Sequence, residues 1–320
     1  MQKIKRRIFI ISGSAVAVVI ALLIGAGFYM LDYSLKPENT GRDLEGSYQY
    51  MYKEYPGLQN WVDSLNSVKA LKDTFIVAPD GARLHAYYIR AAVPTAKTSV
   101  IVHGYTDNAI RMLMIGYLYN HDLGYNVLLP DLRNAGESSG DHFQMGWLDR
   151  LDVLQWMNLA NHLYGDSTRM VVHGISMGAA TTMMVSGEPQ QPYVKCFVED
   201  CGYTNVWDEF AHKLKDGFGL PSFPLMNMTN VLCKLKYGWS FKEASALEQV
   251  KKSTLPMFFI HGDADTYVPT TMVNTLYDAK TVGDKERWIV PGAIHAMSYR
   301  DNAEEYTQKV KAFTEKYVIE

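Results

Sequence analysis

The sequence predicts an α/β fold in which a mostly parallel, eight-stranded sheet is covered by helices on both faces. Short apolar runs rich in β-branched residues alternate with segments of helical periodicity along most of the chain, as parallel strands joined by crossover helices do. The composition, with 48% hydrophobic and 20% charged residues in a chain of 320, is that of a globular protein with enough apolar side chains for one large core.

The expected strands are short, and most of them are uninterrupted apolar runs. They cover residues 74–77, 84–90, 99–103, 126–130, 170–173, 194–199, 257–261 and 287–290. The Asp80-Gly81 pair between the first two strands is typical of a hairpin turn, so these two strands should pair antiparallel at an edge of the sheet. Helices are expected at residues 110–120, 147–162, 177–185, 270–279 and 303–317.

Two segments depart from this alternation. Residues 202–250, after the sixth strand, contain helical pieces at 206–218 and 225–235, which predicts a small helical cap inserted into a main domain of residues 69–320. Residues 32–68 are polar but carry many aromatic side chains. This composition is too aromatic for a free linker, so we expect this connecting segment to pack on the main domain.

The chain begins with a basic segment that contains Lys3, Lys5, Arg6 and Arg7. An uncharged run over residues 8–31 follows, and at about 1.5 Å per residue a helix of this length crosses the hydrocarbon core of a bilayer, about 30 Å thick. The positive-inside bias predicts a single-pass anchor over residues 1–31, with the N-terminus cytoplasmic and the remaining chain outside the cytoplasm. Secretion after signal cleavage near residues 25–27 is the alternative, but the run continues past this point, which favours an uncleaved anchor.

Several classes of partner and cofactor are not indicated. The net charge of −3 and the lack of a basic patch with interleaved aromatics argue against nucleic acid. The three cysteines do not have the spacing of a disulfide framework or a zinc site. His261, Asp263 and Asp265 are close in sequence, but neither a metalloprotease helix motif nor a calcium loop accompanies them, so no metal is expected. Phosphate-binding glycine motifs are also missing, so no cofactor is expected.

A Gly-x-Ser-x-Gly pattern, Gly174-Ile175-Ser176-Met177-Gly178, lies between the strand expected at 170–173 and the helix expected at 177–185. This is the context of a nucleophile elbow, in which the serine adopts a strained conformation and its flanking glycines let neighbouring backbones approach closely. The helix start directs unpaired N–H groups and a positive dipole end toward the serine. We therefore predict that Ser176 is a catalytic nucleophile.

A serine hydroxyl needs a base whose pKa lies near neutrality, which points to histidine. His295 follows the last expected strand on a loop, from which its ring can reach the carboxyl edge of the sheet, and we predict that it is the general base. His103, His173 and His261 lie at turns or beside the elbow, where we expect them to shape turns or pack.

The carboxylate that would orient this histidine is expected after the seventh strand, where Asp263 and Asp265 both lie. We predict that Asp265 orients the histidine and that Asp263 caps the turn. Asp200, at the end of the sixth strand, is a rival position on the same edge of the sheet.

From about Asp73 to its end, the chain resembles the α/β-hydrolases, in particular the group of serine aminopeptidase-like and Bem46-like bacterial hydrolases. The resemblance rests on four motifs: His103-Gly104-Tyr105-Thr106, residues 131–140, the Ser176 elbow, and the segments around Asp265 and His295. The chain order serine, acid, histidine agrees with this fold. The second motif has Asn134 and Ala135 where the common form has Gly and His, which leaves the shape of the substrate pocket open.

The resemblance implies an oxyanion hole formed by the backbone N–H groups of Tyr105 and Met177. Together with the predicted anchor over residues 1–31, it implies a membrane-anchored serine hydrolase that cleaves an ester, thioester or amide of a small-molecule or peptide substrate through an acyl-enzyme on Ser176. A peptidase, with Glu199 or Asp208 binding the free amino group of its substrate, and an acyltransferase remain alternatives within the enzymes. A surface binding protein that keeps the fold without turnover is the alternative outside them.

Apolar side chains of the cap have two possible uses. They could line an acyl pocket or form the cap's own core, and they are Trp207, Phe210, Phe218, Phe223, Met226 and Met228.

Overall fold

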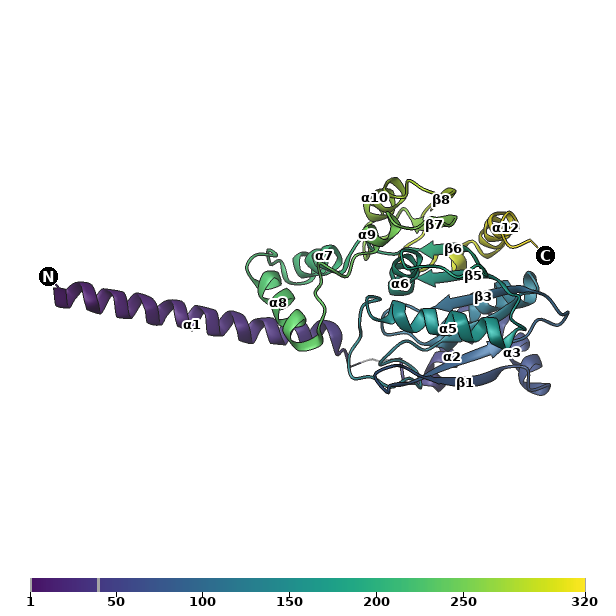
Figure 1. Cartoon of the computed structure of the whole chain (residues 1–320), viewed down its shortest axis with the longest axis horizontal. Coiled ribbons are helices and arrows are strands. Elements are labelled where there is room, and N and C mark those ends of the chain that lie inside the picture. Colours follow the sequence, from purple (N-terminus) through teal and green to yellow (C-terminus); the bar gives the residue numbers. More distant parts are fainter. Residues whose placement is uncertain (1, 39–40, 320) are drawn as a thin grey trace.

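An eight-stranded sheet forms the centre of the molecule, with the strand order β1-β2-β4-β3-β5-β6-β7-β8 (Figure 1). The structure is a computed structural model that describes residues 2–38 and 41–319. The strands are β1 (Lys72–Val77), β2 (Arg83–Ile89), β3 (Lys97–Val102), β4 (Asn126–Pro130), β5 (Arg169–Ile175), β6 (Val194–Asp200), β7 (Met257–Gly262) and β8 (Lys285–Val290). The α/β-hydrolase fold and all eight expected strands are confirmed.

The first two strands form the antiparallel hairpin that Asp80-Gly81 predicts, with Phe75 opposite His85, and β1 lies at the edge of the sheet. β2 also pairs antiparallel with β4, whereas every later pairing, from β4 to β8, is parallel. The carboxyl ends of β3, β5, β6, β7 and β8 therefore lie at one edge of the sheet, where this fold carries its chemistry.

The core lies in two layers, one on each face of the sheet, because successive side chains of a strand point to opposite faces. Val100 and Val102 of β3 belong to one layer and Ile101 to the other. The first layer contains side chains of α5 (Asp149–Leu163), α6 (Met177–Ser186) and α10 (Thr271–Ala279). The second contains side chains of α4 (Leu113–Tyr117) and α12 (Ala303–Thr314).

The helix expected at residues 110–120 is divided into three pieces: the 3-10 turn Ala109–Met112, α4, and a π-helical turn at Leu118–Asp122. Two short helices, α9 (Ala246–Val250) and α11 (Ser298–Asp301), were not expected from the sequence. Between β6 and β7, α7 (Val206–Phe218) and α8 (Leu225–Tyr237) form the helical segment that we call the cap.

The aromatic-rich connecting segment contains two helices that the sequence pattern did not predict, α2 (Leu44–Glu54) and α3 (Leu58–Ser67). Their buried residues, among them Met51, Trp61 and Val62, join the second core layer. Trp61 thus acts as a core side chain of a short amphipathic helix, and Tyr48, Tyr50, Tyr52 and Tyr55 pack, partly buried, against the same layer.

The N-terminal helix, α1 (Gln2–Leu35), projects from the body of the molecule (Figure 1). Its stretch Ser12–Leu35 has a mean hydropathy of 2.3, and within the described residues it is the one helix long and apolar enough to cross a membrane. Only 11% of its most apolar window is buried, unlike a core helix. The helix extends past the expected end at Leu31, and both Leu31 and Leu35 are fully buried in the body.

Candidate active site

Ser176 lies at the turn between β5 and α6, with a φ of 58° and a ψ of −120°. Such a positive φ is strained for a residue with a side chain, and it places the hydroxyl above the carboxyl edge of the sheet. The surrounding backbone is tightly packed: a Cβ on Gly174 would lie 2.1 Å from the Gly178 carbonyl oxygen, and one on Gly178 would lie 2.0 Å from that of Val102. A side chain at either glycine of the Gly-x-Ser-x-Gly pattern would therefore overlap the neighbouring backbone.

The structure brings Ser176, His295 and Asp265 together in one hydrogen-bonded chain. The Oγ of Ser176 lies 2.8 Å from Nε2 of His295, and Nδ1 of His295 lies 2.7 Å from Oδ2 of Asp265. His295 is on the loop between β8 and α11, and Asp265 is on the loop after β7. With the Nδ1 proton donated to the carboxylate, Nε2 is left to accept the serine proton.

Asp265 is held as a carboxylate by donors on both of its oxygens. Its side chain is buried, Oδ1 accepts the N–H groups of Tyr267 and Val268 at 2.8 and 2.9 Å, and Oδ2 also lies 3.2 Å from Nε2 of His261. Burial alone would raise the pKa of Asp265, but the hydrogen bonds from His261 and His295 outweigh it and hold this pKa well below its usual value. His261 is therefore a neighbour of the Asp265 carboxylate, a role that its His-Gly context did not reveal.

The two rival carboxylates have other partners. Asp200 accepts hydrogen bonds from Ser298 and Tyr306, each at 3.1 Å, and burial raises its pKa to about 6. Asp263 accepts the N–H of Gly292 at 2.6 Å, which joins the loops after β7 and β8. Asp265 alone of these three lies at hydrogen-bond distance from His295.

The loop after β3 carries Tyr105, which lines the same cavity as Ser176 and Met177. The position of this loop depends on His103. The Nε2 atom of His103 accepts the N–H of Leu132 at 2.9 Å, and its Nδ1 atom lies 2.7 Å from the Gly104 carbonyl oxygen. Burial lowers the pKa of His103, which keeps the ring neutral, as an accepting Nε2 requires.

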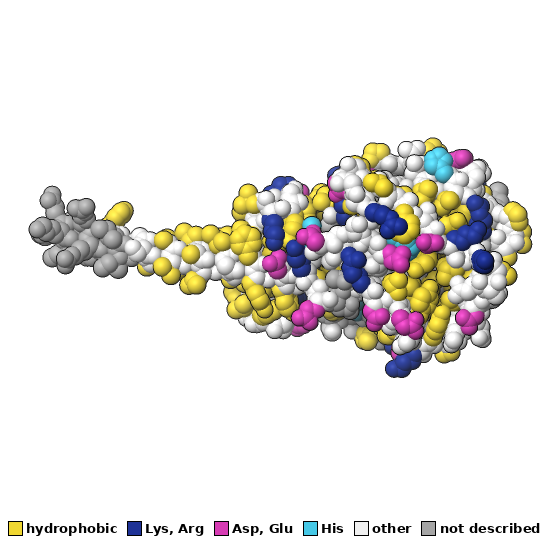
Figure 2. All heavy atoms as spheres, turned by 90° about the horizontal axis from the view of Figure 1, so that it is seen from below, with side chains coloured by type: hydrophobic (Ala, Val, Ile, Leu, Met, Phe, Trp, Pro, Cys, Tyr) yellow, Lys and Arg dark blue, Asp and Glu magenta, His cyan; other side chains and the backbone are white. Residues whose placement is uncertain are grey.

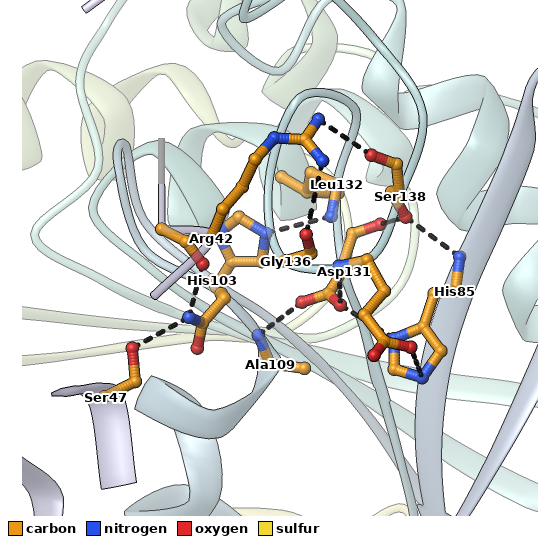
Figure 3. A network of polar contacts seen from close by, with 12 residues as sticks. Arg42, Ser47, His85, His103, Ala109, Asp131, Leu132, Gly136 and Ser138 are labelled. Carbon is orange, nitrogen blue, oxygen red and sulfur yellow. Dashed lines mark hydrogen bonds and ion pairs between the residues drawn. The ribbon is translucent and has the colours of Figure 1, made fainter. Parts of the chain in front are cut away.

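A polar network joins this loop to the second motif (Figure 3). The carboxylate of Asp131 accepts the N–H of Ala109 at 2.7 Å and lies 2.7 Å from Nδ1 of His85. Ser138 donates to the Asp131 carbonyl oxygen at 2.7 Å and accepts the N–H of His85 at 2.9 Å. Arg42 of the connecting segment donates to the Ser138 carbonyl oxygen at 3.1 Å. Residues 131–140 thus hold the loops beside the site in place but do not line the cavity that contains Ser176.

The cavity beside Ser176 has a volume of about 720 Å³. The cap contributes Phe210 and Phe218 to its walls, and the last turn of α1 contributes Tyr33 and Ser34. Of the other apolar cap residues, Phe223 is exposed and Met226 is buried in the core. The apolar side chains of the cap therefore divide between cavity wall, core and surface.

Two ionisable residues that the sequence did not single out, Glu209 and Lys213, also line the cavity. Glu209 is 4% exposed and one of its carboxyl oxygens has no hydrogen-bond partner among the described residues. Lys213, one turn later on α7, holds its Nζ 3.1 Å from the centre of the Tyr267 ring, and that ring lies 4.8 Å from the ring of His295. Burial raises the pKa of Glu209 to about 8 and lowers the pKa of Lys213.

Glu199 and Asp208, the two carboxylates considered for recognition of a substrate amine, do not line this cavity. Glu199 is fully buried and accepts the N–H of Gly202 at 3.0 Å, and burial raises its pKa well above the usual value. Asp208 is exposed, and its carboxylate accepts the hydroxyl of Thr204 at 2.8 Å. Neither Glu199 nor Asp208 lines the cavity, whereas two other acidic residues of α7 do, the buried Glu209 and the exposed Asp216.

One group of potential metal ligands occurs among the described residues. Donor atoms of Cys201, Asp265 and His295 lie within 4.8 Å of one another. Burial raises the pKa of the Cys201 thiol well above its usual value, and a thiol is a poor ligand compared with a thiolate. The hydrogen bonds of Asp265 and His295 already account for this arrangement.

Comparisons with known proteins identify the family and support the fold. A model of the prolyl oligopeptidase family matches residues 117–319. An uncharacterized protein of Bacillus subtilis, YqkD, is 30% identical over 256 residues, which are 79% of this chain and 83% of that protein. Among solved structures, an esterase of Pyrococcus furiosus, Pf2001, has a TM-score of 0.64 and 25% identity and covers 78% of this chain and 91% of its own. An acylaminoacyl peptidase of Pyrococcus horikoshii, at 19% identity, has a TM-score of 0.57 and covers 77% of this chain and 41% of its own.

Proposed function

Because the chain belongs to the prolyl oligopeptidase family of α/β-hydrolases, we propose that it is a serine hydrolase that cleaves an ester, thioester or amide through an acyl-enzyme on Ser176. One observation carries the proposal: the continuous hydrogen-bonded chain from the Ser176 hydroxyl through His295 to a buried Asp265 carboxylate. An activated serine needs a base in contact with it and an acid behind that base, and this chain supplies both.

In the proposed mechanism, Oγ of Ser176 attacks the substrate carbonyl carbon while Nε2 of His295 takes the hydroxyl proton. The oxyanion that forms lies toward the N–H groups of Met177 and Tyr105, and each such donor lowers the barrier by about 3 kcal/mol. His295 then donates its proton to the leaving group, which departs and leaves the acyl-enzyme. Water repeats the two steps and releases the acid. An acyltransferase would differ in the last step only, by admitting another acceptor in place of water.

We propose further that α1 is an uncleaved membrane anchor with the catalytic domain outside the cytoplasm. The apolar stretch Ser12–Leu35 and the basic residues before it support this topology. A cleaved signal sequence is the alternative.

Labelling of the full chain in detergent with a fluorophosphonate probe tests the hydrolase proposal. The wild type should be labelled, and both Ser176→Ala and His295→Ala should abolish labelling, because the first removes the nucleophile and the second removes its base. Circular dichroism of both variants controls for folding. A folded wild-type protein that takes no label would favour the binding-protein alternative.

The cavity also supports a second candidate, a peptidase that recognises the free amino group of its substrate. The buried Glu209 carboxyl, one oxygen of which has no hydrogen-bond partner in the described part of the chain, lies in the same cavity as Ser176. An incoming ammonium group would offset the burial that keeps this carboxyl protonated, so binding and ionisation of Glu209 would occur together.

For this candidate, Glu209→Gln is expected to lower kcat/KM for an aminoacyl ester by about tenfold or more, because a charged hydrogen bond is lost, and to leave the N-acetylated ester unchanged. In the wild type the ratio of the two kcat/KM values should rise with pH as Glu209, whose pKa is raised to about 8, loses its proton, and fall again where the substrate amine becomes neutral, near its own pKa of about 8. The variant should lack this rise. Ionisation of groups that act on both esters cancels in this ratio.

Asp208→Asn, on the exposed face of the same helix, is the matched control. An equal loss on both esters would assign Glu209 a structural role, and an unchanged ratio in Glu209→Gln would remove the peptidase candidate.

A further inference from the structure

We propose that the cap lies in the membrane interface and that the cavity takes its substrate directly from the bilayer, as the acyl ester of a lipid. This inference rests on the proposed serine hydrolase function and names its substrate class.

The cap meets α1 at the depth where the helix should leave the hydrocarbon. A span of about 30 Å uses about 20 residues at about 1.5 Å each, so a span that starts after the basic segment, at residue 8, ends near Gly27. At Gly27 the helix touches α8: a Cβ there would lie 2.8 Å from a methyl carbon of Leu232 and 3.1 Å from the Met228 side chain. Tyr29 and Tyr33, which are exposed two and six residues later, are the residue type that gathers at membrane interfaces.

The body is fixed to this end of α1 and cannot move away from the membrane on a linker. The Ser34 carbonyl oxygen accepts the hydroxyl of Tyr105 at 2.8 Å, and the Leu35 carbonyl oxygen accepts the N–H of Phe143 at 2.8 Å. On the other side of the helix, Lys236 of α8 forms an ion pair with Asp32 at 3.1 Å. Contacts on both sides therefore set the height of the cap relative to the bilayer.

The cap exposes large apolar side chains beside this helix. Phe223 is 75% exposed and Leu235 is 78% exposed, and Leu220 and Val231 are exposed as well. Val231 and Leu235 are four residues apart on α8 and so share one face of it. Figure 2 shows apolar side chains along α1 and on the end of the body from which it projects. An exposed apolar surface that continues a membrane-spanning helix is suited to the lipid interface.

This surface leads into the cavity. The rings of Tyr33 and Phe218 meet edge to face with their centres 5.6 Å apart, and both residues are partly exposed while also lining the cavity that contains Ser176. A lipid ester group lies at the boundary between hydrocarbon and headgroups, which is the level of this rim. The rings of Tyr33 and Phe218 thus give an acyl chain apolar contacts on its way to Ser176.

The reaction is hydrolysis of an acyl ester. The Ser176 oxygen bonds to the acyl carbon while the bond from that carbon to the lipid alcohol oxygen breaks, and the alcohol leaves with the proton that His295 carried. A water oxygen then bonds to the acyl carbon, the bond to Ser176 breaks, and the water proton returns through His295 to Ser176. The products are a fatty acid and the alcohol part of the lipid.

The position of the cap is tested without reference to activity. The three native cysteines are buried, so Leu235→Cys in the full chain accepts an environment-sensitive fluorophore selectively. In vesicles of phosphatidylcholine with some phosphatidylglycerol, nitroxide-labelled lipids should quench this fluorophore several-fold more than one at Val282→Cys, an exposed residue between α10 and β8. Equal quenching at the two positions would overturn the proposal.

The substrate class is tested with two esters in the same vesicles. The Val231→Glu/Leu235→Glu variant should hydrolyse long-chain diacylglycerol in the bilayer about tenfold more slowly than the wild type, because charge on these positions repels the apolar interface, and soluble p-nitrophenyl butyrate at the wild-type rate. Val282→Glu should change neither rate. If fluorophosphonate still labels Ser176 and p-nitrophenyl butyrate is cleaved but the wild type does not cleave diacylglycerol, this inference fails alone. Loss of labelling in the wild type would mean failure of the proposed function itself.

Discussion

Replacing Asp265 by asparagine is expected to lower kcat by about 10⁴-fold with little change in KM or fold. The amide oxygen can still accept the N–H groups of Tyr267 and Val268, so the loop keeps its shape. The amide nitrogen would then face Nδ1 of His295 as a donor. The ring would have to carry its proton on Nε2, the tautomer that cannot accept the Ser176 proton.

Steady-state kinetics with p-nitrophenyl butyrate measure kcat and KM, and urea unfolding of the same protein measures whether the fold is kept. Asp263→Asn is the control, since Asp263 accepts a backbone N–H in the same loop and does not contact His295. Asp200→Asn tests the rival acid. A loss of activity in Asp200→Asn that exceeds the loss in Asp265→Asn would contradict the assignment.

Gly178→Ala is expected to lower the free energy of unfolding by at least about 3 kcal/mol or to prevent folding. In an ordinary helix the same change stabilises by about 1 kcal/mol. Here the added methyl carbon would lie 2.0 Å from the Val102 carbonyl oxygen and 2.7 Å from that of His103. These atoms belong to the backbone of β3 and the loop after it, so no side-chain rotation relieves the overlap.

The matched control is Gly116→Ala in α4, which is also buried and helical. Its methyl carbon would meet side chains of Leu129 and Trp61 at 3.6 Å, an ordinary contact distance, so its urea midpoint should stay near or above the wild-type value. A Gly178→Ala midpoint equal to that of Gly116→Ala would show that α6 can move away from β3, against the packing described here.

The strands were predictable because their signal is local. A buried parallel strand is an apolar run of β-branched residues whatever its neighbours are, and the Asp80-Gly81 turn specifies its own hairpin. The elbow was predictable because its motif is short. Gly174 is required by the Gly178 carbonyl four residues later, and Gly178 is required by the backbone of the adjacent strand β3. The departure at Asn134 also has a local reason: its φ of 65° is one that asparagine tolerates better than most residues when glycine is absent.

Other features depend on contacts that no local pattern reveals. Glu209 and Asp208 are adjacent on α7 and therefore point about 100° apart, and only the docking of the helix decides which one faces the cavity. His261 reaches Asp265 because the chain folds back after β7. Leu31 and Leu35 look the same in sequence whether lipid or protein covers them.

The last turns of α1 bear on how a soluble form of this protein could exist. Leu31 and Leu35 belong to the core, and Tyr33 and Ser34 form part of the cavity wall. A chain cut at the small residues 25–27 would keep all four, whereas one that began after Leu35 would lose two core side chains and one side of the cavity. Any protease that releases the enzyme in active form must therefore cut within the exposed part of the helix, and the released protein would carry a short apolar stub with it.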